Sequence, residues 1–179
     1  MYPRKFISAL LLSAVCWPAL VHPQVQVLGV EIGSSSSQQV RAQLAKQTKV
    51  HDVGINMYTG GVQFKTDGVG YGIDNLSEVV YVFDREEKLG AVFMRFEKQR
   101  FDEIFSFLAG KYKVVGKTRP FVGDKAAQFK AKGVTILLIA PHLSFAMDAL
   151  YIRDDMYQRF NVQTEQEMRE KQSIEKSKF

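Results

Sequence analysis

Cysteine is almost absent from this chain of 179 residues, which contains only Cys16. A single cysteine cannot form an internal disulfide, so the fold must depend on an apolar core. The sequence also lacks the Gly-x-Ser-x-Gly, Walker and His-Glu-x-x-His patterns that accompany common catalytic sites. His51 and His142 stand without carboxylates at metal-ligand spacing. The sequence therefore predicts no enzyme, no metal site and no cofactor, with a hydrolase that uses His51 or His142 beside a carboxylate as the alternative.

A large excess of one charge sign is missing as well. The formal net charge is +5, and it falls to +3 without Arg4 and Lys5. This excess is too small to predict binding to nucleic acid or to an anionic membrane. Apolar residues make up 46% of the chain and aromatic residues 12%. Such a chain can bury a core and is not predicted to be disordered.

No hydrophobic run is long enough to predict a membrane-spanning helix. The run Phe6 to Cys16 has 11 residues and follows two positive charges, which is typical of a secretory signal peptide. We predict that residues 1–23 are a cleavable signal peptide and that the protein is periplasmic, with an uncleaved anchor as the alternative. Bacterial lipidation requires a small residue before the cysteine, and Val15 precedes Cys16. Membrane attachment is therefore expected only if Cys16 is lipidated.

The remaining sequence repeats itself. The segment 44–50 resembles 108–114, and Gln63-Phe64-Lys65 matches Gln128-Phe129-Lys130. Further matches, in the same order, join Ala91, Phe93 and Arg95 to Ala149, Tyr151 and Arg153. Ordered matches of this kind indicate two copies of one unit. We predict a first repeat over residues 24–97 and a second over residues 98–160.

Periodicity predicts the content of each unit. Ser34 to Ser37 offer N-caps for a helix that ends near Gln47, and a second helix carries an apolar stripe from Phe101 to Tyr112. Strands are predicted at 62–66, 78–84, 88–97, 127–131, 134–140 and 145–153. The fold class is α+β: two tandem copies of a helix plus antiparallel strands, with the helices on one sheet face. Residues 161–179 are almost wholly polar and are predicted to form a solvated helical tail, with a partner-binding helix as the alternative.

Several predicted strands are apolar on both faces, although helices on one side would cover only one face. Something else must cover the other face. Tyr and Arg are common at interface hot spots. We therefore predict a partner-binding surface that contains Tyr81, Phe83, Phe93, Arg95, Tyr151 and Arg153. The alternative is that the two copies bury these side chains against each other as core.

The opening Gly33-Ser34, followed by Val40 and Leu44 and then by strands, is duplicated in a chain with an export signal. This organisation resembles the tandem-repeat proteins typified by the β-lactamase inhibitor protein, and the small outer-membrane-assembly lipoproteins that share the single unit. The resemblance implies a helical layer on an antiparallel sheet whose open face binds another protein, and no enzymatic activity. The chain departs from these families by lacking the inhibitor's disulfides and a good lipidation motif.

The predicted function is a non-enzymatic, exported protein-binding module of the inhibitor, immunity or envelope-assembly accessory type. Its predicted partner is another envelope or secreted protein, bound through the sheet face. The alternative is a carrier that holds a small apolar ligand between the two repeats. Such a carrier predicts a pocket of several hundred Å³ lined by Phe and Met residues.

Overall fold

The computed structural model describes residues 25–178; the predicted signal peptide and Cys16 lie outside the described residues. A short two-stranded ribbon precedes the main sheet. The elements in chain order are β1 (Gln26–Val27), β2 (Val30–Glu31), α1 (Ser37–Leu44), β3 (Val50–Ile55), β4 (Gly60–Asp67), β5 (Leu76–Asp84), β6 (Leu89–Glu97), the 3₁₀ turn η1 (Lys98–Arg100), α2 (Phe101–Lys111), β7 (Lys113–Thr118), β8 (Lys125–Ala131), β9 (Val134–Ala140), β10 (Ala146–Arg153) and α3 (Asp154–Lys176).

The main sheet has eight antiparallel strands in the order β3-β4-β5-β6-β10-β9-β8-β7. β3 to β6 form one half of this sheet, and β7 to β10 form the other half. The halves meet where β6 pairs with β10, with Phe93 opposite Leu150 and Arg95 opposite Asp148. β3 and β7 are its two edges. The α+β class and the antiparallel sheet agree with the sequence-based prediction.

Both predicted helices are present; α1 buries both of its predicted apolar residues, and α2 buries part of its predicted stripe. α1 begins with a capping box, in which Ser36 caps the Gln39 backbone N–H and the Gln39 side chain accepts from the Ser36 N–H. Val40 and Leu44 are its buried residues. In α2, Phe101 and Leu108 are buried. These side chains join the main core with the rings of Phe64, Tyr81, Phe83 and Phe129.

Strand alternation divides the sheet into two faces. We call the face that contributes to the main core the core face; its strand residues include Val79, Val92, Ile136 and Met147. The alternate residues form what we call the outer face, represented by Val80, Phe93, Leu137 and Leu150. Each core-face strand residue pairs across the ladder with another core-face residue, as Tyr81 does with Val92.

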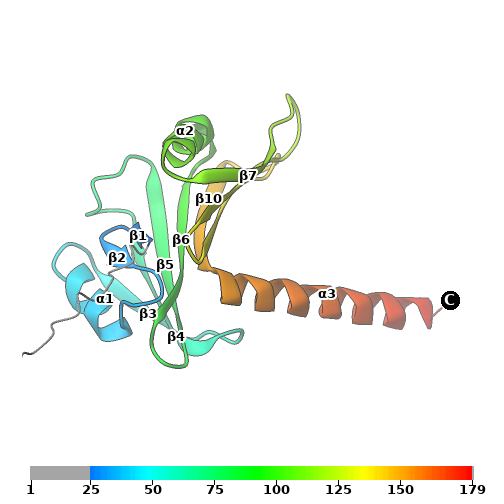
Figure 1. Cartoon of the computed structure of the whole chain (residues 1–179), viewed down its shortest axis with the longest axis horizontal. Coiled ribbons are helices and arrows are strands. Elements are labelled where there is room, and N and C mark those ends of the chain that lie inside the picture. The colour runs from blue at the N-terminus through cyan, green and yellow to red at the C-terminus, as the bar shows by residue number, and fades with distance from the viewer. Residues whose placement is uncertain (1–24, 179) are drawn as a thin grey trace, which may run out of the picture.

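The third helix, α3, is a single helix of 23 residues. It begins directly after β10, seven residues before the predicted tail, and its first turn carries Asp154 and Asp155. Figure 1 shows the helix extending away from the sheet. Beyond Phe160 its residues are almost all exposed. No helix within residues 25–178 is long and apolar enough to cross a membrane.

Candidate functional site

The six predicted binding residues do not share one surface. Tyr81, Phe83 and Tyr151 are buried in the main core, with exposed fractions of 0%, 0% and 7%. Phe93 and Arg95 lie on the outer face instead. The expectation that these side chains form a common surface is therefore wrong. In this fold the three core-face rings have almost no accessible area for a partner.

The cause is a bulge in the β5–β6 hairpin. Phe83 pairs with Leu89, but Val82 pairs with Ala91, so the ladder skips Gly90. One extra residue shifts the alternation, because successive side chains point to opposite faces. Leu89 therefore lies on the core face, whereas Ala91 and Phe93 lie on the outer face. A symmetrical hairpin register, without the bulge, would place all three on one side.

Core packing explains the burial of the aromatic residues. The Phe64 ring lies 5.6 Å from the Tyr81 ring and 5.1 Å from the Phe83 ring, centroid to centroid. The Tyr81 hydroxyl is 3.0 Å from the Tyr71 hydroxyl, which in turn is 2.7 Å from the Thr66 hydroxyl. Burial raises the pKa of the Tyr81 hydroxyl well above its usual range. The hydrogen bond satisfies the one polar atom that Tyr81 brings into the core.

Arg153 fastens the start of α3 to the sheet. Its guanidinium donates to Asp84 at 2.7 Å and to Asp155 at 2.5 and 3.0 Å. Asp155 also accepts a bond of 2.8 Å from Arg159. The hydrogen bond from Arg153 is the main reason that the pKa of Asp155 lies below its usual value. Arg153 is thus held within the molecule by two carboxylates.

Arg95, the other predicted arginine, is also paired within the chain. Its Nε donates to Asp148 Oδ1 at 2.9 Å, directly across the β6–β10 ladder. The ion pair is exposed, so its contribution to stability is small. It lies at the polar margin of the outer face, next to Phe93 along β6.

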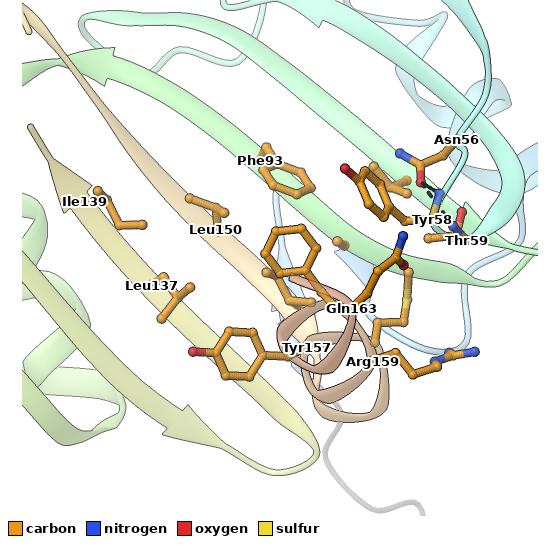
Figure 2. Close-up of a pocket in the computed structure, with 15 residues that line it drawn as sticks. Asn56, Tyr58, Thr59, Phe93, Leu137, Ile139, Leu150, Tyr157, Arg159 and Gln163 are labelled. Atoms are coloured by element: carbon orange, nitrogen blue, oxygen red, sulfur yellow. Dashed lines mark hydrogen bonds between the residues drawn. The ribbon is translucent and has the colours of Figure 1, made fainter. Parts of the chain in front are cut away.

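A groove lies on the outer face of the sheet. We call it the outer groove; its volume is about 480 Å³. Its floor crosses β5, β6, β10 and β9, and α3 and the β3–β4 turn form its walls (Figure 2). The lining residues are Asn56, Tyr58, Thr59, Val82, Ala91, Phe93, Leu137, Ile139, Leu150, Ile152, Met156, Tyr157, Arg159, Phe160 and Gln163.

The first turns of α3 roof one side of this groove. Met156 is buried against the outer face together with Val82, Ala91 and Ile152. A β-carbon added at Gly90 would overlap the Met156 side chain, so the glycine leaves the space that Met156 fills. Further along the helix, the Phe160 ring meets the Tyr58 ring edge to face, with centroids 5.7 Å apart. The helix therefore covers part of the apolar face and leaves the rest open.

Sequence reasoning identified only one lining residue of this site, Phe93. For the other lining residues, the signal in the sequence was that both faces of several strands are apolar. This signal led to the expectation that something covers the second face. The contribution of α3 was missed, because Met156, Tyr157 and Phe160 precede the polar tail and were assigned to the second repeat. The alternation of side chains along β9 could have placed Leu137 and Ile139 on the same face, and that along β10 could have done so for Leu150 and Ile152.

The polar groups at the groove are mostly engaged by the chain itself. Asn56 donates to Gln63 at 2.7 Å and accepts from the backbone of Tyr58 and Thr59. Gln163 donates to Glu167 at 3.0 Å. Arg159 is the only charged residue that lines the groove, and it is paired with Asp155. The groove therefore offers an apolar surface without a free charge on its lining.

The two histidines stand apart from this site. His51 lies on the edge strand β3 and His142 in the β9–β10 loop, and both are exposed. Among residues 25–178, no hydrogen bond joins either imidazole to a carboxylate; Asp124 accepts from the backbone N–H of His142. Within the same range, no cluster of three or more metal-ligating side chains occurs.

Comparisons with protein-family models, with characterised proteins and with solved structures give no match to this chain. Function is therefore inferred from the geometry of the outer groove.

Proposed function

We propose that the protein is an exported, non-enzymatic binding module whose binding site is the outer groove, and that its occupant is a small apolar ligand. The observation that carries the proposal is the groove itself: about 480 Å³ of concave, mostly aliphatic and aromatic surface. Binding sites for small molecules in proteins have this size and this lining. Phe93, Met156 and Phe160 supply the phenylalanine and methionine surface expected of a carrier.

The position of the groove also suits the proposed tandem repeat. Each half of the sheet follows one helix and has four strands. The edge strand of each half has a bulge at the same place: the ladder skips to Gly54 opposite Gln63, and to Gly116 opposite Gln128. Such bulges are specific features of a fold. They support two copies of one unit with a helix on the same face of each, residues 24–97 and 98–160, followed by the tail.

The pairing of the strands favours a different alignment of the two proposed copies. Paired residues can be followed across each half, Phe64 to Tyr81 to Val92 in the first and Phe129 to Ile136 to Tyr151 in the second. Val92, and not Phe93, therefore corresponds to Tyr151. Phe93 directly follows Val92 on the strand, and successive strand residues point to opposite faces. Phe93 therefore lies on the outer face, whereas Tyr151 lies on the core face. The groove spans the junction of the two copies, because β5 and β6 meet β9 and β10 there.

Binding of the neutral fluorescent probe N-phenylnaphthylamine tests the proposal. The probe should bind the wild-type protein with increased, blue-shifted emission. The double variant Leu137→Asn plus Ile139→Asn places two amides on the groove floor and should weaken binding by at least about tenfold. A matched control, Val114→Asn plus Val115→Asn, makes the same change on the exposed edge strand β7 and should bind as the wild type does. Absence of binding, or equal loss in both variants, would contradict the proposal.

A protein partner is the second candidate function. It is favoured by the charged margin of the outer face, where the pairs Arg95–Asp148 and Lys65–Glu78 border the apolar centre. An apolar centre within a polar rim is the usual plan of a protein interface. Affinity capture from an envelope extract should then retain one specific protein on the wild type and on the β7 control, and lose it on the groove variant. An unchanged catch on all three would exclude this use of the groove.

A further inference from the structure

We infer that the outer groove is built for one extended, uncharged hydrocarbon chain of about ten carbons, such as the alkyl part of a neutral single-chain lipid. The inference rests on the proposed function and specifies its ligand. Three independent features of the groove carry it: the length of its floor, its volume, and the pairing of the charges around it.

The floor fixes the length of the occupant. Leu137, Leu150 and Phe93 are successive cross-strand neighbours on β9, β10 and β6. The adjacent row, Ile152, Ala91 and Val82, continues the lining onto β5. Four neighbouring strands span three inter-strand spacings, roughly 14 Å, which is the length of an extended chain of about ten carbons. Ile139 lies at the same end of the groove as Leu137, and Asn56 and Thr59 lie at the opposite end (Figure 2). The chain would therefore run across the strands.

The volume agrees with the length. A groove of about 480 Å³ holds roughly 16 water-sized groups at about 30 Å³ each, which is enough for a chain of about ten carbons. A methylene group is of similar size. Met156 and Phe160 restrict the space from above, because both lie on the part of α3 that packs over the sheet. A floor and a roof on opposite sides suit a flat or narrow apolar ligand, such as an extended chain.

Charge decides between a neutral chain and a fatty-acid anion. A carboxylate would require an unpaired cation at the groove, and Arg159 is the only cation in the lining. Its guanidinium lies 2.8 Å from Asp155. Arg153, at the base of the helix, is paired with Asp84 and Asp155, and Arg95 is paired with Asp148. Each of these three arginines is thus matched by a carboxylate of the chain, so the lining of the groove complements an uncharged ligand.

A series of straight-chain alcohols tests the inference by displacement of N-phenylnaphthylamine from the full chain. Affinity should rise by about fourfold for each added methylene, because each one buries further apolar surface. The rise should stop between decanol and dodecanol, where the floor is filled. The series is repeated on the Leu137→Asn plus Ile139→Asn variant, which should lose the dependence on chain length, and on the Val114→Asn plus Val115→Asn control, which should retain it. Circular dichroism melts establish that all variants are folded.

Decanoate and decanol are then compared to test the charge. Decanol should bind at least as tightly as decanoate, and Arg159→Gln should leave the ratio of the two affinities unchanged within about twofold. Tighter binding of decanoate that disappears in Arg159→Gln would overturn the neutral ligand, and affinity without dependence on chain length would overturn the extended chain. Both results leave the proposed function intact, since the probe still binds in the groove. Failure of the probe itself to bind would instead remove the proposed function.

Discussion

The contact between Gly90 and Met156 can be tested by a double-mutant cycle. Gly90 is buried on β6, and a β-carbon there would overlap the sulfur and terminal methyl of Met156. The φ angle of Gly90 is not positive, so an alanine meets no backbone strain at this position. Gly90→Ala should therefore act only by pushing the Met156 side chain away from the outer face. The same change would loosen the roof of the groove.

The structure sets the size of the effect. Overpacking a core costs about 1 to 3 kcal/mol of folding stability. Replacing a glycine inside a strand by alanine regains roughly 0.5 to 1 kcal/mol. Gly90→Ala should therefore destabilise the fold by about 1 to 2 kcal/mol. Met156→Ala should cost about 2 kcal/mol, near the lower limit for a buried methionine, because the cluster around it is small. In the Met156→Ala background the overlap is gone, and Gly90→Ala should stabilise by about 0.5 to 1 kcal/mol. The coupling between the two sites is then about 2 kcal/mol.

Urea unfolding of the four proteins measures these free energies, with a constant m-value as evidence that only stability changes. Gly116→Ala serves as the matched control: it is also a strand glycine without a positive φ, and its nearest neighbour would be Gln128 Cβ at 3.8 Å. This variant should be neutral or slightly stabilising. If Gly90→Ala has the same cost with and without Met156, α3 does not pack on β6 as described.

Two further predictions concern titratable groups. Because the folded state lowers the pKa of Asp155, this residue stabilises the fold above about pH 4, and that contribution is lost as the pH falls through the folded pKa. Urea unfolding between about pH 6 and pH 3 should show a smaller loss of stability in Asp155→Asn than in the wild type, and equal slopes would contradict the pairing with Arg153. Burial raises the pKa values of Tyr81 and Tyr151, so both phenols should remain protonated in an alkaline absorbance titration until the protein unfolds. Their titration together with exposed tyrosines in the folded protein would place them outside the core.

The local signals that predicted the fold are those that depend on a few neighbouring residues. The capping serines before α1, the apolar stripe of α2 and the run 134–140 that became β9 all agree with the structure. Two edge strands, β3 and β7, were not predicted as separate elements. Their residues are mostly exposed, so they lack the apolar alternation that identifies a half-buried strand.

The candidate site was harder to predict because it depends on register and on a distant helix. A bulge at Gly90 changes the face of every residue on one side of it, and alternation alone does not reveal where a ladder skips a residue. The groove also needs Met156 and Phe160, whose contacts with the sheet are made by a helix that leaves the end of β10. Their apolar side chains are visible in the sequence, but the direction of α3 is not.

The two edges of the sheet bear on how the protein behaves at high concentration. An open edge with unpaired amides can template the strand of a neighbouring molecule. Here β3 and β7 are each interrupted by a bulge, at Gly54 and Gly116, and β7 carries Lys113 and Lys117. A foreign strand would meet a broken row of hydrogen-bonding groups and a cationic border. The molecule should therefore resist stacking into fibrils even when it is crowded, which leaves the apolar surface on its outer face as the region where self-association would begin.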